Sequence, residues 1–393
     1  MTADEERLSL RVKDLKPSAT LSITAKAKDM KTKGVDIVNL GAGEPDFPTP
    51  ENVKAAAIKA IEENFTYYTP ASGIWELKEA VAKKLKEFNG LNYEPGEICI
   101  SCGAKQSIYN ALQAFLNPGD EVLIPIPYWV SYPAQVTLTG GIPKYLPTDN
   151  SYKIIPEILE ENITDLTKAL ILNYPSNPAG ITYNGKELKE IADVILPYDL
   201  LVISDEVYEY FTYDEVKHVS FASINEETYL RTVTISSLSK TYSMTGWRVG
   251  YTACPKEMAE AISKIQSHTT SNPTSIAQKA AVEALTGPQD RVIEMVNAFD
   301  RRRRFLLKRI REIEGLECIK PEGAFYVFPE ISSFGLSSLE FSSRLLEEGL
   351  VATIPGEAFG SLQNIRISYS ASMEDLEKGM DRLERFCDRL GRG

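Results

Sequence analysis

The sequence has few residues of the kinds that build zinc sites and disulfide frameworks. Its 393 residues include five cysteines and two histidines. Cys99 and Cys102 have the spacing of a metal-binding pair, but no second pair follows. We therefore expect neither a structural metal nor a disulfide framework. Scattered thiols are typical of a reducing compartment, so a cytoplasmic location is expected.

The sequence also lacks an excess of positive charge and any long apolar run. The formal net charge is −12, which argues against nucleic acid or an anionic membrane as a partner. No stretch approaches the roughly 20 apolar residues that span a bilayer. Residues 1–11 are charged and do not resemble a signal peptide. A hydrophobic fraction of 43% and a charged fraction of 25% are those of a folded globular protein.

The middle of the chain alternates between helical and strand patterns, which predicts an α/β fold with a mostly parallel sheet. Ile108, Leu112 and Phe115 mark one face of a helix that ends at an Asn-Pro-Gly-Asp cluster. Short apolar runs rich in β-branched residues predict buried strands. These runs are residues 121–125, 169–172, 200–204, 232–236 and 250–254.

The pattern changes after about residue 290, where a long charged helix is predicted over residues 291–314. Its four consecutive arginines, Arg301 to Arg304, are interpreted as a solvated helix face, with an anion-binding patch as the alternative. Short strands at 324–328, 351–354 and 365–369 and a closing helix from Met373 follow. We predict a large domain, 49–289, and a smaller discontinuous α+β domain made of 1–48 and 290–393.

Polar side chains follow several predicted strands at the point where each strand ends. Asn177 follows the strand at 169–172, and Asp205 ends the strand at 200–204. Ser237 and Lys240 follow the strand at 232–236. Parallel α/β sheets gather ligands at the carboxyl ends of their strands. The positions therefore predict one shared site.

Lys240 and Arg248 suggest amine chemistry beside a phosphate. A buried lysine near other cations falls below its usual pKa of about 10.4 and becomes a nucleophilic amine. Arg248 can hold a phosphate through two parallel hydrogen bonds, and Ser237 can donate another. A lysine and an arginine at this spacing also fit simple surface charge. The preceding strand and the neighbouring Thr-Gly-Trp at 245–247 favour a site.

A second candidate for phosphate binding is the segment Ser-Cys-Gly-Ala-Lys at 101–105, which opens a helix directly. Small residues there let backbone N–H groups and the helix dipole meet an anion, although an ordinary helix start has the same pattern. The segment lacks the Gly-Lys-Ser/Thr element of a nucleotide-binding P-loop. Gly41 and Gly43 likewise do not complete a dinucleotide fingerprint.

Three further polar residues have both a chemical and an ordinary explanation. Asp205 can keep a ring nitrogen protonated, or it can cap the next element. Arg366 lies between apolar neighbours and can clamp a carboxylate, or it can face solvent from a strand. The proline-rich loop around Asn177 is also explained by turn chemistry alone.

Taken together, these motifs are specific, and the chain resembles the fold-type I pyridoxal-phosphate enzymes. Among these it is most similar to class I aminotransferases, in particular the bacterial aspartate aminotransferase branch called Iβ. The similarity runs from Lys16 to the closing helix. Its motifs are AGEPDF at 42–47, YTP at 68–70 before Gly73, PYWVSYP at 127–133, NYPSNPAG at 173–180, SDEVY at 204–208, and Lys240 with MTGWR at 244–248.

The resemblance implies pyridoxal 5'-phosphate as cofactor and gives each site residue a role. Lys240 would bind the cofactor covalently and move the proton of the substrate's α-carbon, and Asp205 would keep the ring nitrogen protonated. Tyr208 and Asn177 would hydrogen-bond the ring oxygen. Trp129 and Val207 would cover the two ring faces, Ala104, Lys105, Ser237 and Arg248 would hold the phosphate, and Tyr68 would reach it from the neighbouring subunit of a homodimer.

The resemblance also implies amino acids and 2-oxo acids as substrates. Arg366, with the N–H of Gly43 and the side chain of Asn177, would bind the α-carboxylate. Lys105 and Thr20 would bind a distal carboxylate, which favours aspartate and glutamate. The interface arginine that the enteric and animal branch uses has no counterpart in residues 267–273. Ala179 departs from the threonine that the family usually has.

The leading hypothesis is thus an aspartate:2-oxoglutarate aminotransferase that works by ping-pong half-reactions. An aminotransferase preferring aromatic amino acids, prephenate or alanine is the closest alternative. A carbon–sulfur lyase would use the same lysine and would release ammonia and pyruvate. A pyridoxal-phosphate-sensing transcription regulator would need a DNA-binding domain, and about 35 residues precede the core with no helix-turn-helix pattern.

Overall fold

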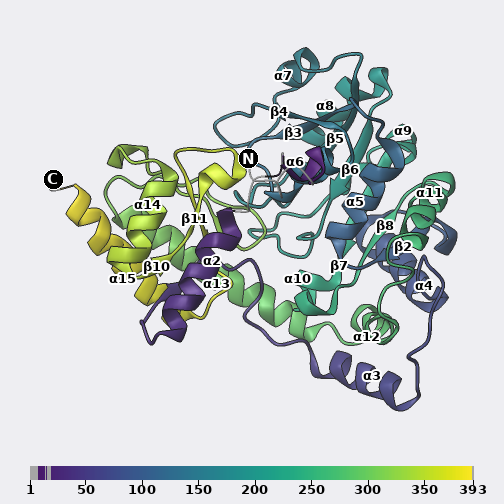
Figure 1. Ribbon diagram of the computed structural model, residues 1–393, viewed down its shortest axis with the longest axis horizontal. Coiled ribbons are helices and arrows are strands. Elements are labelled where there is room, and N and C mark those ends of the chain that lie inside the picture. Colours follow the sequence, from purple (N-terminus) through teal and green to yellow (C-terminus); the bar gives the residue numbers. More distant parts are fainter. Residues whose placement is uncertain (1–7, 14, 16–18, 392–393) are drawn as a thin grey trace.

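A computed structural model describes residues 8–13, 15 and 19–391 and shows a larger and a smaller part side by side (Figure 1). A seven-stranded sheet organises the larger part, in the order β2-β8-β7-β6-β5-β3-β4. Six of these strands run in the same direction, and β8 runs in the opposite direction. The strands are β2 (Ile98–Ser101), β3 (Glu121–Pro125), β4 (Ile142–Leu146), β5 (Thr167–Asn173), β6 (Leu201–Asp205), β7 (Thr232–Ser237) and β8 (Gly250–Ala253).

The predicted mostly parallel α/β sheet is therefore confirmed, and five of its strands fall at the predicted places. The sequence pattern missed β2 and β4. β4 contains Pro143 and Lys144 and lies at the edge of the sheet, where its side chains are largely accessible. Such a strand has no continuous apolar run to identify it.

Helices cover both faces of the sheet, which explains why the residues of its central strands are mostly buried. Along β5, Ala169 and Ile171 pack into one core cluster, whereas Leu170 and Leu172 pack into another on the opposite face. The helices of this part are α3 (Glu51–Glu62), α4 (Trp75–Lys84), α5 (Ala104–Phe115), α6 (Ser131–Leu138), α7 (Pro156–Glu161), α8 (Gly185–Ile195), α9 (Glu226–Leu230), α10 (Leu238–Thr241), α11 (Lys256–Ser267) and α12 (Ser275–Thr286).

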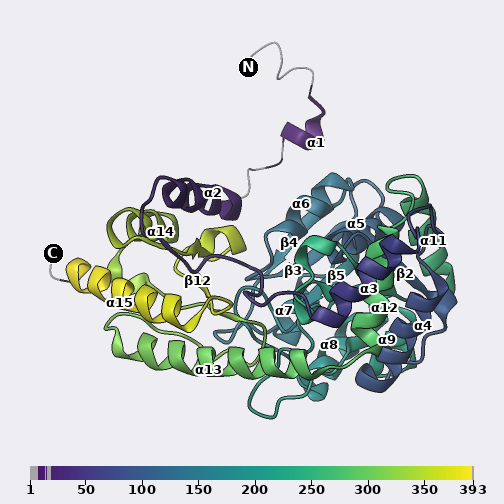
Figure 2. The same cartoon turned by 90° about the horizontal axis from the view of Figure 1, so that it is seen from below.

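The smaller part joins the two ends of the chain. Val38 pairs with Val351 in a parallel ladder, so the N-terminal segment is held against the C-terminal region. In Figure 2, α2 and α14 lie along one side of this part and α13 along the other. Its elements are α2 (Ala19–Thr32), β1 (Val38–Asn39), α13 (Asp290–Glu312), β9 (Tyr326–Val327), α14 (Ser338–Arg344), β10 (Val351–Ala352), β11 (Ile354–Pro355), β12 (Ile365–Ser368) and α15 (Met373–Leu390). The short helix α1 (Leu10–Lys13) contacts α6 of the larger part instead.

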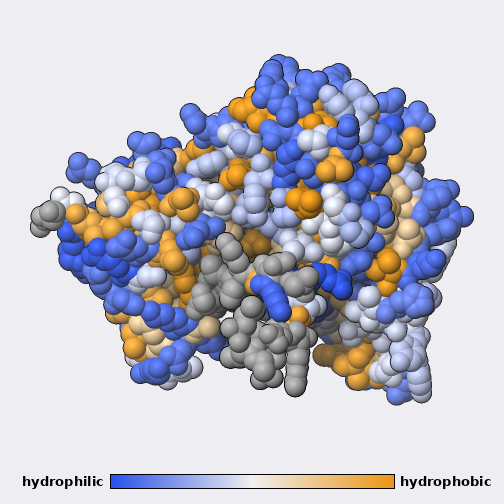
Figure 3. Space-filling view, turned by 45° about the horizontal axis from the view of Figure 1, so that its top comes forward, coloured by the Kyte–Doolittle hydropathy of each residue, from blue (hydrophilic) through white to orange (hydrophobic). Residues whose placement is uncertain are grey.

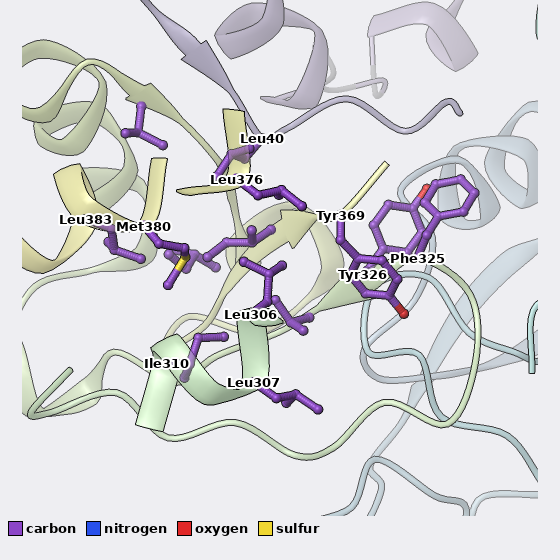
Figure 4. Packing of buried hydrophobic residues seen from close by; sticks show 14 of the residues in the cluster. Leu40, Leu306, Leu307, Ile310, Phe325, Tyr326, Tyr369, Leu376, Met380 and Leu383 are labelled. Carbon is purple, nitrogen blue, oxygen red and sulfur yellow. The ribbon is translucent and has the colours of Figure 1, made fainter. Parts of the chain in front are cut away.

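The larger of the apolar clusters in the described residues of the smaller part continues toward the larger part. Leu40 from the N-terminal segment, Leu306 from α13 and Leu376 from α15 belong to it (Figure 4). Phe325 and Tyr326 extend the same cluster to Tyr208 of the larger part. The exact boundaries between the two predicted domains stay a prediction.

The four arginines of α13 differ from the expected solvated face. Arg301 and Arg304 are exposed, but Arg302 and Arg303 are buried. Arg302 donates two hydrogen bonds of 2.8 Å to Asp46. Arg303 donates to Asp300 and to the carbonyl of Pro321. The prediction was wrong for these two residues. In an α-helix that packs against other elements on one side, four consecutive residues point in different directions, so some of them face the packed side.

The surface offers no long apolar helix. None of the helices in the described part of the chain is long and apolar enough to cross a membrane. On the face shown in Figure 3, hydrophilic residues predominate and apolar residues appear among them in small groups.

Candidate active site

A cavity of about 620 Å³ lies at the carboxyl ends of β5, β6 and β7. Asn173 and Asp205 end β5 and β6, and Ser237 ends β7. The smaller part closes the cavity with residues of the segment 39–44 and with side chains of β9 and β12. The cavity thus lies where the sequence predicted a shared site.

All but two of the predicted site residues line this one cavity. Tyr68 does not, and its side chain is 89% exposed. Thr20 lies in the first turn of α2, but its side chain is outside the described part of the structure. The residues brought together are Gly43, Ala104, Lys105, Trp129, Asn177, Asp205, Val207, Tyr208, Ser237, Lys240, Arg248 and Arg366.

Lys240 carries an amine with a weakened hold on its proton. It lies in α10, the short helix that begins directly after β7. Its Nζ donates a 2.5 Å hydrogen bond to the carbonyl of Gly43, and within the described residues no carboxylate pairs with it. Burial lowers the pKa of Lys240 to about 8, and the charges of Arg366 and Arg248 act in the same direction. Lys240 therefore loses its proton far more readily near neutral pH than an exposed lysine does.

Asp205 is a buried acid at the end of β6. Burial raises the pKa of Asp205 to about 6, even though hydrogen bonds from Tyr132 and the Val207 N–H favour the charged form. The Tyr132 hydroxyl lies 2.7 Å from Oδ2, and the Val207 N–H lies 3.3 Å from Oδ1. Above about pH 6 the residue is an anion that can pair with a cationic ring nitrogen.

Arg366 is arranged as a receptor for a carboxylate. It lies on β12, is 5% exposed, and stacks on the ring of Tyr326 at 4.4 Å. Its guanidinium donates to the side chain of Asn177 at 2.9 Å and to the carbonyl of Gly41 at 2.8 Å. Its Nε has no partner among the described residues. Although burial lowers the pKa of Arg366, arginine stays charged in proteins, so this unneutralised cation can bind an anion bidentately.

The start of α5 and Arg248 form a cradle of the right kind for phosphate. Gly103 precedes the helix at φ 83°, and a Cβ there would come within 2.4 Å of the Arg248 guanidinium. A Cβ on Gly250 would equally meet the backbone nitrogen of Ala104. The first N–H groups of a helix have no partners within it and favour anions. Ser237 Oγ, which accepts a hydrogen bond from the Ser239 N–H, adds a hydroxyl donor.

Aromatic side chains complete the cavity. Trp129 is half-buried and meets Tyr132 edge-on, with ring centroids 5.3 Å apart. The Nζ of Lys105 lies 4.9 Å from the Trp129 ring. The hydroxyls of Tyr208 and Tyr326 are 2.8 Å apart. An amine for an aldehyde, an acid for a ring nitrogen, a phosphate cradle and a flat aromatic wall together fit pyridoxal phosphate.

Among the lining residues to which sequence reasoning assigned no role, Tyr132, Asn173 and Tyr326 contact predicted site residues. Tyr132 lies inside the motif at 127–133 but received no role, although its spacing from Trp129 is one helical turn. Asn173 directly follows the strand predicted at 169–172. Its side chain donates to the Asp205 carbonyl at 3.1 Å and accepts from the Asn177 N–H at 2.9 Å. Tyr326 comes from the smaller part, and nothing in its local sequence indicates its contact with Tyr208 and Arg366.

Comparisons with known proteins agree with this geometry. The family model for aminotransferases of class I and II matches residues 35–383. The aspartate aminotransferase of Geobacillus stearothermophilus is 48% identical over 97% of this chain and 99% of its own length. The aspartate/prephenate aminotransferase of Cereibacter sphaeroides is 46% identical over 96% of this chain and 97% of its own.

A solved structure gives the same result for the fold. The aspartate aminotransferase of Rhizobium meliloti superimposes with a TM-score of 0.94 at 40% identity, covering 98% of this chain and 99% of its own. Sequence, fold and cavity agree, and the chain belongs to the class I and II aminotransferases, a family of pyridoxal-phosphate-dependent enzymes.

Proposed function

We propose that this protein is an aspartate aminotransferase. It transfers the amino group of L-aspartate to 2-oxoglutarate in two alternating half-reactions and yields oxaloacetate and L-glutamate. The observation that carries the proposal is one cavity that holds an amine of low pKa, Lys240, and an unneutralised buried guanidinium, Arg366. An amino acid needs both groups, because its α-carboxylate must be fixed while its α-proton is moved.

The residues of the cavity divide the work with the cofactor. When bound, pyridoxal phosphate withdraws electrons from the substrate's α-carbon. The carboxylate of Asp205 would hold the proton on the ring nitrogen, and Lys240 would hold the cofactor and then move the α-proton. Ser237, Arg248 and the start of α5, including Ala104 and Lys105, would hold the phosphate. Trp129 and Val207 would pack on the ring, and Tyr208 with Asn177 would bond its oxygen.

Lys105 and Thr20 supply the preference for a dicarboxylic substrate. The Lys105 ammonium lies at the cavity edge beside Trp129. Partial burial and the nearby Arg248 lower the pKa of Lys105, because both destabilise its positive charge. A second carboxylate bound beside Lys105 would offset that destabilisation. The names of relatives such as the Geobacillus protein support aspartate as the amino donor.

A wider substrate range is the second candidate. An ammonium is a less directional partner for a carboxylate than a guanidinium, and the cavity wall includes Trp129, Tyr326 and Phe359. Such a wall also suits an aromatic or prephenate-like side chain. The aspartate/prephenate aminotransferase among the relatives supports this alternative.

The active unit is proposed to be a homodimer in which Tyr68 reaches the partner's phosphate. Tyr67 and Tyr68 are 81% and 89% exposed, and Ile58 and Ile61 on nearby α3 are more than half exposed. Exposed apolar groups of this size mark an interaction surface. We also propose a domain division at 48/49 and 289/290, and a cytoplasmic location that suits the five free thiols.

Visible absorbance of the purified protein tests the proposal. The protein with bound cofactor should be yellow, and its visible absorption band should bleach when L-aspartate is added without an oxo acid. If phenylalanine, alanine or the amino acid formed from prephenate bleaches the band and L-aspartate does not, the protein is an aminotransferase with a different substrate preference. A protein that shows no band even after pyridoxal phosphate is added would contradict the role of Lys240.

A further inference from the structure

We propose that the buried hydroxyl of Tyr132 is a positioning group for Asp205, which orients the carboxylate and keeps it ionised for the cofactor's ring nitrogen. The inference deepens the proposed function and rests on it. Tyr132 would act through Asp205 and would not take part in bond making.

The geometry isolates this contact from solvent. Tyr132 lies on α6, is 1% exposed, and its hydroxyl lies 2.7 Å from Oδ2 of Asp205. The Val207 N–H binds the other carboxylate oxygen, and Asn173 binds the backbone carbonyl of Asp205. Three separate elements thus fix the residue at the end of β6. Because a carboxylate offers about four acceptor positions, these two bonds leave room for a partner in the cavity.

The charges around Asp205 leave the phenol as its main protein donor. Tyr208 and Glu206 follow it in the chain, Tyr132 faces it from α6, and Lys240 faces it from α10. The Glu206 carboxylate is occupied elsewhere, since Ser204, Ser220 and His218 all bond to it within 2.8 Å. Burial and the Asp205 carboxylate raise the pKa of Tyr132 well above its usual range. The phenol therefore stays protonated and donates.

Tyr132 also has a packing role that any test must separate from this one. Its ring meets Trp129 edge-on at 76°. Replacement by phenylalanine keeps the ring and removes the oxygen alone. Tyr128→Phe is a matched control, because Tyr128 lies in the same segment, stacks on Tyr145 at 5.2 Å and does not line the cavity.

The first readout is the pKa of Asp205 in the cofactor-free full chain. It is measured by carbon-13 NMR of the carboxyl group during a pH titration. In the wild type, burial raises the pKa of Asp205 to about 6, and the titration midpoint is expected there. Loss of a hydrogen bond to a charged group should raise the pKa by about one unit or more in Tyr132→Phe, with no change in Tyr128→Phe. An unchanged titration in Tyr132→Phe would overturn the proposal.

The second readout is the dissociation constant of pyridoxal phosphate at pH 8, measured in a double-mutant cycle with Asp205→Asn. Tyr132→Phe should weaken binding about 10-fold in the wild-type background and have little effect beside Asp205→Asn. An equal loss in both backgrounds would mean that Tyr132 only supports packing, and the proposal would fail.

Two further outcomes are separable. A wild-type protein that does not bind pyridoxal phosphate would contradict the proposed function, whereas a wild type that binds it and an unchanged Tyr132→Phe would contradict only this inference. If Tyr132→Phe does not fold, the ζ-carbon resonance of Tyr132 in the wild type decides. It should shift in step with the titration of Asp205, and a flat response would overturn the contact.

Discussion

Two lysines of this protein, the buried Lys84 and the partly buried Lys240, have opposite surroundings. The Nζ of Lys84 lies 2.5 Å from a carboxylate oxygen of Glu209 and 2.8 Å from the amide oxygen of Asn89. The Nζ of Lys240 meets the backbone carbonyl of Gly43 and lies in the field of Arg366 and Arg248. One ammonium is neutralised by a direct carboxylate contact. The other lies near two arginines and near the acids Glu44 and Asp205, and none of the described carboxylates pairs with it directly.

The difference shows how the same side chain becomes structural in one place and reactive in another. Burial alone would raise the pKa of Glu209, but Lys84, His218 and Asn89 hold it below its ordinary value. The network is closed, since Asn89 and Ser236 also donate to Glu209. Glu206, Glu209 and His218 lie close enough to resemble metal ligands, yet hydroxyl, amide and ammonium donors already occupy their oxygens. None of the described acids pairs directly with Lys240 in this way, which suits the chemistry proposed for its amine.

The largest expected effect is on the reactive side of this comparison. Lys240→Ala should lower the turnover of L-aspartate with 2-oxoglutarate by about 10⁴-fold, because the group proposed to move the α-proton is lost. The exposed Lys33→Ala is the control and should match the wild type. Steady-state kinetics, with circular dichroism to check the fold, measure this. Wild-type turnover in Lys240→Ala would end the assignment.

Asp205→Ala should have the next largest effect. Without the carboxylate the ring nitrogen loses its charged partner, and we expect turnover to fall by about 10³-fold. The pre-steady-state rate of bleaching by L-aspartate measures the step directly. A near-normal rate would remove Asp205 from its proposed role.

Replacing Lys84 should lower the free energy of unfolding and should not act on the reaction directly. Lys84→Met leaves Glu209 buried without its cation and should cost about 3–5 kcal/mol of unfolding free energy. The double variant with Glu209→Gln should recover most of this loss, because no unpaired charge remains. Urea denaturation measures both. Equal stability of Lys84→Met and the wild type would erase the contrast between the two lysines.

Replacing Lys240 by methionine should change the unfolding free energy in the opposite direction, and the change should depend on pH. Its folded-state pKa of about 8 is below the ordinary 10.5, so the unfolded chain binds the proton more tightly. The cost to stability is full below about pH 8 and disappears as the pH rises from 8 to 10.5. Cofactor-free Lys240→Met should therefore be more stable than the wild type by about 1–3 kcal/mol at pH 7. A constant difference up to pH 10.5 would show that the ammonium is not strained.

The sequence predicted the parts of the fold and site that depend on local pattern. Apolar runs identified the central strands because β5, β6 and β7 are covered on both faces. Strand ends and short motifs identified Asp205, Asn177 and Lys240, since a parallel sheet brings those positions to one edge. The edge strand β4 was missed because it has no such run.

By itself, the sequence determined the layered sheet, the reactive lysine and the edge at which the polar residues meet. Tertiary structure decided which charges are neutralised. Arg302 and Arg303 became buried structural residues through Asp46 and Asp300, whereas Arg366 and Lys240 kept no acidic partner among the described residues. Arg303 and Asp300 are three residues apart in α13, but Arg302 and Asp46 are 256 positions apart, so no local pattern encodes the second pairing. It arises only when the N-terminal segment packs against α13.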